Sequence, residues 1–414
     1  MRNFTQKSSM FTRTTIHLLM LALFSVAFGA ITVFAQPKAY VTNNFDHTVS
    51  VIDTATNTVV ATVPVGTGPF GIAVTPNGAF AYVVNASADT VSVIDAKTNT
   101  VVATIPVGPN PFLIAITPNG AFAYVTCMRN GTVSVINTAT NTVVKTVPVG
   151  VFPAGVAIAP NGAFAYVANE LSGTISVINT ATNTVVATIP GMSVPFFLAV
   201  TPNGAFLYVT DFSANAVVVI DTATNTIVTS IPVGLRPRGV DITPNGAFAY
   251  VASTDGISVI STTTNTITTT IHGRVDWDGL AVNPDGTRVY APSIFSNDVS
   301  VIDTATNTVT TTIATGNSPR VVAFPTRTPI NSLIAQVQAL VAEGDLTQKG
   351  GDELIKKLEA VQLKLDKAQT EAACNQLGAF INQVNALINN GSLNASDGLT
   401  LINAANAARA SIGC

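Results

Sequence analysis

The chain has 414 residues, of which 47% are hydrophobic and only 10% are charged. Its formal net charge is −3, so the chain lacks the excess of basic residues that nucleic-acid-binding proteins carry. We therefore expect no nucleic-acid partner. Three cysteines and three histidines argue against a Cys/His zinc cage, and we expect no cofactor. A metal site made of Asp side chains alone is the alternative, because aspartates recur near equivalent links between strands. Such residues more often form turns. They are Asp46, Asp89, Asp211, Asp255 and Asp298.

Residues 1–35 are typical of a secretory signal peptide. Three basic residues open the segment, and an apolar run follows over residues 16–35. Small residues at the −3 and −1 positions predict cleavage before Gln36. The alternative is a retained membrane anchor, because the run is about as long as a spanning helix of about 20 residues. After cleavage we expect no membrane span and a protein that is secreted, periplasmic or at the cell surface.

An internal repeat of about 42 residues organises the chain. All seven tyrosines fall at one position of it: Tyr40, Tyr82, Tyr124, Tyr166, Tyr208, Tyr250 and Tyr290. Each repeat contains four short β-type runs, which in the second repeat are residues 70–75, 80–84, 90–94 and 100–107. One link carries Asn77-Gly78, and another carries Asn99 where a left-handed residue is tolerated. Four antiparallel strands per repeat predict the blades of a β-propeller, with a one-dimensional β-solenoid as the alternative.

The two ends of the repeat region indicate that the ring is closed. The chain enters at the second strand of a repeat, residues 39–42, and leaves after a lone first-strand segment, residues 320–324. Three N-terminal strands and one C-terminal strand would complete the same blade and hide both edges. We therefore predict an all-β, seven-bladed β-propeller with 3+1 closure over residues 36–327.

Three motifs carry a resemblance to a known family. Tyr40-Val41-Thr42-Asn43, Val51-Ile52-Asp53-Thr54 and Val74-Thr75-Pro76-Asn77-Gly78 resemble the YVTN family of β-propeller repeats. Those repeats occur in bacterial secreted proteins and archaeal surface-layer proteins. Relatives of the fold include lactonase-type hydrolases and propeller domains of haem and copper enzymes. The resemblance implies a fold and an exported location more than it implies an activity.

The composition changes to a helical pattern in residues 328–414. Leu333, Val337, Leu340 and Val341 form an apolar stripe at helical spacing. The region is itself duplicated, since residues 334–337 match residues 381–384. Two helical hairpins, and hence a small four-helix bundle, are predicted. Residues 379–384 resemble the FIMAH-type modules of secreted bacterial proteins, which implies docking or attachment rather than catalysis.

The cysteines fall into two groups. Cys374 and Cys414 would lie near the start of the third helix and the end of the fourth, which can be neighbours in an antiparallel bundle. An oxidising compartment would permit a disulfide between them, with two free thiols as the alternative. Cys127 replaces the Asn of the Tyr-Val-Thr-Asn motif, and we expect a half-buried small residue there.

The candidate binding surface is the face on which the links between repeats vary, here called the top face. It carries two sets of side chains, one aromatic and one charged: Phe70, Phe112, Phe152 and Phe196, and Arg236, Arg238, Arg274, Asp276, Trp277, Asp278 and Arg320. A funnel with these two halves would suit a small anionic or carbohydrate-like ligand or a peptide. The alternative is that the Arg and Asp side chains pair with each other and the Phe rings plug gaps between blades.

One position of the innermost strand differs in a single repeat. Among the seven copies of this strand in chain order, the fifth has Asp241 and the other six have alanine. A carboxylate there must find a partner or shift its pKa. Asp241 could be a catalytic or cation-binding group beside the channel, with His272 as its catalytic companion. The alternative is a salt bridge to Arg238 or contact with channel water.

These observations favour an exported, non-enzymatic propeller that presents its top-face loops to a protein, glycan or small-molecule ligand. The first alternative is a lactonase-like hydrolase that uses Asp241, Arg238 and His272 at the channel mouth. The second is a structural surface-coat element, in which the chain would associate with itself.

Overall fold

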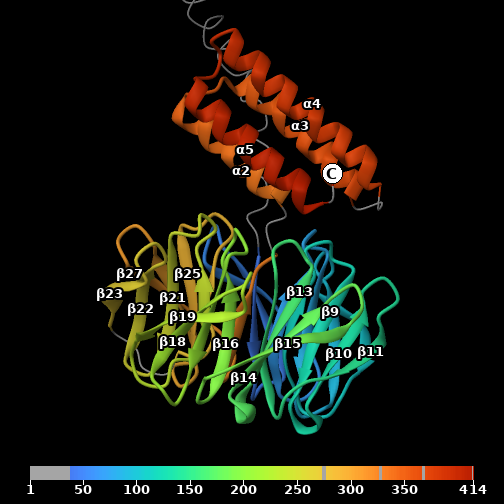
Figure 1. Ribbon diagram of the computed structural model, residues 1–414, viewed down its shortest axis with the longest axis vertical. Coiled ribbons are helices and arrows are strands. Elements are labelled where there is room, and N and C mark those ends of the chain that lie inside the picture. Colours follow the sequence, from blue (N-terminus) through green and yellow to red (C-terminus); the bar gives the residue numbers. More distant parts are fainter. Residues whose placement is uncertain (1–37, 273–276, 326–328, 366–368, 413) are drawn as a thin grey trace, which may run out of the picture. The chain divides into compact units, whose positions relative to one another are not determined.

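The strands form the propeller that the repeats predict. The computed structural model describes residues 38–272, 277–325, 329–365, 369–412 and 414. Its strands make seven four-stranded antiparallel sheets, which follow one another around a ring in chain order (Figure 1). The signal peptide predicted for residues 1–35 lies outside the described residues.

Six blades take their strands consecutively from the chain, from the innermost strand to the outermost. They are β4 (Pro69–Val74), β5 (Phe80–Asn85), β6 (Thr90–Asp95) and β7 (Thr100–Pro106); β8 (Pro111–Ile116), β9 (Phe122–Cys127), β10 (Thr132–Asn137) and β11 (Thr142–Pro148); β12 (Pro153–Ile158), β13 (Phe164–Asn169), β14 (Thr174–Asn179) and β15 (Thr184–Pro190); β16 (Pro195–Val200), β17 (Phe206–Asp211), β18 (Ala216–Asp221) and β19 (Thr226–Pro232); β20 (Val240–Ile242), β21 (Phe248–Ser253), β22 (Gly256–Ser261) and β23 (Thr266–Ile271); and β24 (Ala281–Val282), β25 (Arg288–Ser293), β26 (Asp298–Asp303) and β27 (Thr308–Ala314). Two short 3-10 turns follow second strands, η1 (Met128–Asn130) and η2 (Glu170–Ser172).

The remaining blade confirms the predicted 3+1 closure. It contains β1 (Ala39–Asn43), β2 (Thr48–Asp53) and β3 (Thr58–Pro64), with β28 (Pro319–Ala323) as its innermost strand. Tyr40 lies opposite Ala323, and Val41 lies opposite Val322. The two ends of the repeat region thus complete one sheet, which excludes the open solenoid.

The burial of each strand follows from its place in the blade. In β6 the four residues 91–94 are all buried, because both faces of the third strand pack against neighbouring blades. In the outermost strand β7 only Ile105 is buried. Unbroken runs of Val and Ile therefore mark the inner strands, and mixed Thr and Val mark the outer ones.

The invariant Tyr and Asn positions of the repeat join adjacent blades. Each tyrosine is at most 2% exposed. The Asn residues of the last turn adopt left-handed backbone conformations, as predicted; Asn57, for example, has φ 53°. Several Tyr hydroxyls donate to the Asn side chain of the next blade, at 2.5–3.0 Å: Tyr82 to Asn141, Tyr124 to Asn183, Tyr208 to Asn265, Tyr250 to Asn307 and Tyr290 to Asn57.

The four helices follow the propeller strands in the sequence. They are α2 (Pro329–Glu343), α3 (Gln348–Leu365), α4 (Thr370–Asn389) and α5 (Ala395–Ser411). Their apolar faces share one core, in which Leu333, Leu354, Phe380 and Leu401 are at most 1% exposed. None of the described helices is both long and apolar enough to span a bilayer.

The cysteines behave differently in the two regions. Cys374 and Cys414 form the predicted disulfide, with their Cα atoms 5.7 Å apart. Cys127 is free and 0% exposed, so the expectation of half-burial was wrong. Its strand β9 is packed on both faces, and burial raises the pKa of its thiol.

Candidate functional site

One residue from each blade lies at the top end of the innermost strands. These residues share a single repeat position and are here called the mouth ring: Phe70, Phe112, Ala154, Phe196, Arg238, Asp278 and Arg320. In six blades a proline comes directly before the ring residue, and its fixed φ sets the entry of the strand. The sequence therefore presents seven side chains of four kinds (Phe, Arg, Ala and Asp) on one repeated backbone.

Backbone contacts hold ring residues of adjacent blades together. Thr42 and Thr210, from the Tyr-Val-Thr position, donate to the carbonyls of Phe70 and Arg238 at 2.7 and 2.8 Å. The Gly239 N–H donates to Asp278 O at 2.8 Å, and a Cβ at Gly239 would lie 2.9 Å from that same oxygen. A side chain at residue 239 would therefore push apart the blade of β20–β23 and the blade of β24–β27.

The first half of the ring is aromatic. Phe70 stacks on Phe112 with ring centroids 4.1 Å apart, and Phe112 lies 5.6 Å from Phe196. This second contact spans the blade whose ring residue is Ala154, which has no side chain beyond Cβ. Phe212, which follows β17, extends the series, with its centroid 6.0 Å from that of Phe196.

The second half of the ring is an ionic triad. The Asp278 side chain is fully buried and accepts from Arg238 at 2.6 Å and from Arg320 at 3.2 Å. Two guanidinium groups thus share one carboxylate, which leaves a net charge of +1. The pairing of Arg and Asp with each other, given above as an alternative, is what these residues do.

Cation–π contacts join the two halves. The guanidinium of Arg320 lies 5.6 Å from the centroid of Phe70, and that of Arg238 lies 5.7 Å from the centroid of Phe212. The contacts therefore run continuously around the mouth, through the four Phe rings and the triad. Each guanidinium is fixed on one side by Asp278 and on the other by an aromatic face.

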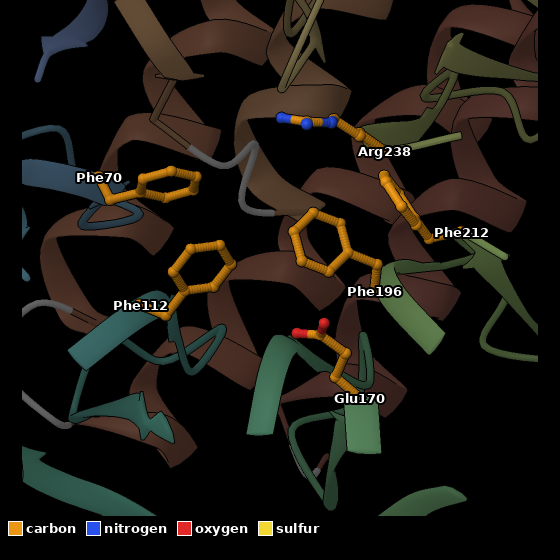
Figure 2. Close-up of a pocket in the computed structure, with 6 residues that line it drawn as sticks. All are labelled: Phe70, Phe112, Glu170, Phe196, Phe212 and Arg238. Atoms are coloured by element: carbon orange, nitrogen blue, oxygen red, sulfur yellow. The ribbon is translucent and has the colours of Figure 1, made fainter. Parts of the chain in front are cut away.

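A pocket of about 260 Å³ lies within this arrangement. It is lined by Phe70, Phe112, Phe196, Phe212, Arg238 and Glu170 (Figure 2). Glu170 belongs to η2, and among the described residues its carboxylate has no hydrogen-bond or ion-pair partner. Burial raises the pKa of Glu170. In Figure 2 Glu170 and Arg238 lie on opposite sides of Phe196.

Several predicted site residues lie elsewhere. Trp277 is only 1% exposed and packs with Tyr250 and Leu280, so its predicted place in an open funnel was wrong. It precedes Asp278 where other blades have proline, and its large apolar ring is buried between blades instead. Phe152 and Arg236 occupy left-handed positions of their loops, with φ 61° and 52°, and do not line the pocket.

Two further candidates, Arg274 and Asp276, lie outside the described residues. Glu170 and Phe212 line the pocket but were missed from the sequence. Both directly follow a second strand, at a repeat position whose residue changes from blade to blade. That variation is the signal that would have identified them.

Asp241 occupies the position of the innermost strand that is Ala in the other six blades. Its carboxylate oxygens accept from the N–H groups of Ile242 and Val282, both at 2.8 Å. Burial raises the pKa of Asp241 to about 6, against the lowering effect of these two hydrogen bonds. The salt bridge to Arg238 is not formed, because Arg238 pairs with Asp278.

His272 does not lie beside Asp241. It follows the outermost strand β23 and is exposed, whereas Asp241 lies on the innermost strand β20 of the same blade. Three strand spacings, about 14 Å, separate the two strands. The structure does not bring the two proposed catalytic side chains together.

The recurring aspartates of the top face act in turns and loops. Asp46, Asp89, Asp211 and Asp255 each accept a backbone N–H from a neighbouring top-face loop, at 2.6–3.0 Å. Within the described ranges, no cluster of three or more His, Cys, Asp or Glu side chains could hold a metal ion.

Three family models match parts of the chain. Residues 109–272 match the seven-bladed β-propeller family described as Lactonase, and residues 19–129 match the YNCE-like β-propeller. Residues 330–410 match the FIMAH domain. No curated protein matches the chain.

Solved structures give the same fold. Hydrazine synthase of Kuenenia stuttgartiensis has 25% identity and a TM-score of 0.60, covering 64% of this chain and 92% of its own. A functionally unknown protein from Desulfotomaculum acetoxidans has 17% identity and a TM-score of 0.64, covering 70% of this chain and 100% of its own. The dihydro-heme d1 dehydrogenase NirN has 14% identity and a TM-score of 0.54, covering 70% of this chain and 75% of its own. The chain is thus a seven-bladed β-propeller followed by a four-helix region that matches the FIMAH domain.

Proposed function

We propose that this protein is an exported, non-enzymatic binding protein of the YVTN propeller type. It presents the mouth ring to a ligand or partner in the periplasm or at the cell surface. The helical region, residues 328–414, serves for docking or attachment, and the propeller extends over residues 36–327. Export is supported by the basic and apolar pattern of residues 1–35 and by the Cys374–Cys414 disulfide.

The observation that carries the proposal is the pocket at the mouth ring. The turns that set blade geometry are nearly constant, whereas the ring position differs in charge and size from blade to blade. The variable residues then meet in space and form a pocket with an aromatic wall and two charged groups. Binding sites collect where a rigid scaffold holds variable loops.

A lactonase-like hydrolase is the second candidate, because residues 109–272 match the Lactonase family. The separation of Asp241 and His272 argues against the catalytic pair that we considered. The placement of Arg238 argues in the same direction, since its guanidinium pairs with Asp278 and not with Asp241. The two candidates differ in what an experiment would record: binding without turnover, or hydrolysis.

A ligand screen on the mature chain tests the proposal. Small peptides, amino acids, glycan fragments and lactones would be tested by ligand-observed NMR, and the lactones also for hydrolysis. We expect at least one class to bind, with affinity reduced about tenfold or more in Phe112→Ala. Phe295→Ala is the matched control, because Phe295 is 75% exposed and does not line the pocket.

Two results would overturn the proposal. One is hydrolysis of lactones by the wild-type chain that is lost in Asp241→Asn. The other is binding that Phe112→Ala leaves unchanged for every class, which would place recognition elsewhere.

A further inference from the structure

The pocket carries two opposite charges that its own residues do not cancel. The Glu170 carboxylate has no hydrogen-bond or ion-pair partner within the described part of the chain. On the other side, Arg238 and Arg320 share the single carboxylate of Asp278, so one positive charge is in excess. Phe196 lies between the two charged groups, with Phe70 and Phe112 on one side and Phe212 on the other (Figure 2).

We propose that this pocket binds a small zwitterion with an apolar body, of the class of an apolar amino acid or short peptide. Its ammonium group lies against Glu170 and the Phe rings, and its carboxylate lies against Arg238. This inference rests on the proposed binding function and specifies the ligand for the same pocket.

The ammonium end follows from Glu170 and its aromatic neighbours. Rings attract cations through their negative faces, and a carboxylate adds direct charge pairing. Burial raises the pKa of Glu170 because a desolvated carboxylate lacks compensation. A bound cation would supply that compensation, whereas an anion would be repelled.

The carboxylate end follows from the geometry of Arg238. Its side chain is 31% exposed, although one guanidinium nitrogen is held by Asp278 at 2.6 Å. Asp278 and Phe212 fix the plane of the guanidinium, so its remaining N–H groups are oriented before a ligand arrives. A planar fork of this kind suits a carboxylate.

The volume of the pocket and the residues that line it restrict the part of the ligand between its two charged groups. The volume of about 260 Å³ lies just below the range of about 300–1,000 Å³ that is typical for drug-sized ligands. Four Phe side chains form most of the wall, so the body between the charges is apolar. A neutral glycan would gain nothing from the opposed charges.

The test measures binding of free and capped amino acids to the whole mature chain by isothermal titration calorimetry. The probes are L-phenylalanine, L-leucine and dileucine, together with N-acetyl-phenylalanine, which lacks the cation, and phenylalaninamide, which lacks the carboxylate. We expect at least one free zwitterion to bind, and its capped analogues to bind about tenfold more weakly or worse. Choline reports whether a cation alone is sufficient.

Variants assign the ammonium end. Glu170→Gln should weaken binding of the free amino acid about tenfold and leave N-acetyl-phenylalanine unaffected. Glu359→Gln is the matched control, because Glu359 is exposed on α3. Arg236→Gln is a charge control for the top face, since Arg236 is exposed and outside the pocket.

The inference is overturned if capped and free ligands bind equally, if choline binds as tightly as the zwitterions, or if none of the zwitterions binds. The proposed function would survive those results if another class binds in a Phe112-dependent way. The proposed function would fail together with the inference if Phe112→Ala changes nothing for any class.

Discussion

The hydroxyl of Tyr290 donates a hydrogen bond of 3.0 Å to the side-chain oxygen of Asn57. These residues are 233 positions apart in the sequence and belong to the last and first blades of the ring. The same Tyr-to-Asn contact joins consecutive blades elsewhere, as between Tyr124 and Asn183 at 2.6 Å. The closing seam is therefore built from the contact that the repeat uses at four other blade junctions.

Removing the Tyr290 hydroxyl should weaken the seam. Tyr290→Phe deletes the donor and leaves the ring in place, so we expect a loss of about 1 kcal/mol in the free energy of unfolding. Urea denaturation followed by the emission of Trp277, the only tryptophan, would measure it. Tyr124→Phe is the matched variant away from the seam and should cost a similar amount. An unchanged midpoint in Tyr290→Phe would show that this bond contributes nothing to closure.

The ionic triad of the mouth ring should be sensitive to the charge of Asp278. In Asp278→Asn one amide oxygen replaces two carboxylate oxygens, and two guanidinium groups lose their counter-ion. Because the guanidinium groups are partly exposed, we expect a destabilisation of about 3 kcal/mol, the low end for a broken buried pair.

A second substitution in the triad gives the control. Arg320→Gln added to Asp278→Asn removes one of the two unpaired charges, so the double variant should be more stable than Asp278→Asn alone. Thermal unfolding of the three proteins would measure the difference. Equal melting temperatures for the single and double variants would contradict a charge-based role of Asp278.

Asp241 should make stability depend on pH in a defined direction. Burial raises its pKa from 3.8 to about 6, so between these pH values the folded chain holds a proton that the unfolded chain has released. The free energy of unfolding therefore falls as pH rises from about 4 to 6, by up to about 3 kcal/mol at about 1.4 kcal/mol per pKa unit. Above about pH 6 this cost is fully present.

Asp241→Ala removes that contribution and restores the residue of the other six blades. Its stability relative to the wild type should increase between pH 4 and pH 6 and then level off. Urea denaturation at pH 4, 5, 6 and 7 would measure this difference. Asp345→Ala, at an exposed carboxyl in the helical region, is the control measured under the same conditions. A flat difference for Asp241→Ala would show that the carboxyl is not desolvated.

The Cys374–Cys414 disulfide should stabilise the four-helix region. It closes a loop with a sequence separation of 40, for which chain entropy gives about 4 kcal/mol. Cys374→Ser with Cys414→Ser should therefore lower the thermal midpoint of the helical circular dichroism signal. Reductant should reproduce the effect in the wild type and add nothing in the double variant. If the variant melts like the oxidised wild type, the loop is not held by this bond.

The fold could be predicted from the sequence because its signals recur. The number of blades follows from Tyr40 and its equivalents, and the turns follow from the Asn of the last turn. The closure follows from the unmatched strand at residues 320–324. Each is a backbone or packing requirement that every blade must meet. Because each of these features recurs along the sequence, it can be distinguished from a chance occurrence.

The candidate site was less predictable because it depends on single blades. A salt bridge between Arg238 and Asp241, three residues further along the chain, was one alternative, but Arg238 pairs with Asp278, which holds the equivalent position in the next blade. Trp277 was placed on the surface because it lies in a variable loop, yet burial of its ring between blades decided its position. Comparing one repeat position across all blades identifies such neighbours better than comparing residues within one loop.

The 3+1 closure also sets an order of events during biosynthesis. Because β1 pairs with β28, the first blade to be synthesised stays incomplete until the ribosome has added residue 323. Until then the inner edge of β1 has no partner, and the ring has two open ends. A pairing between residues so far apart is reached slowly, since a long loop must close first. The chain therefore stays in an unfinished state during synthesis, and the ring closes only after its last strand is delivered.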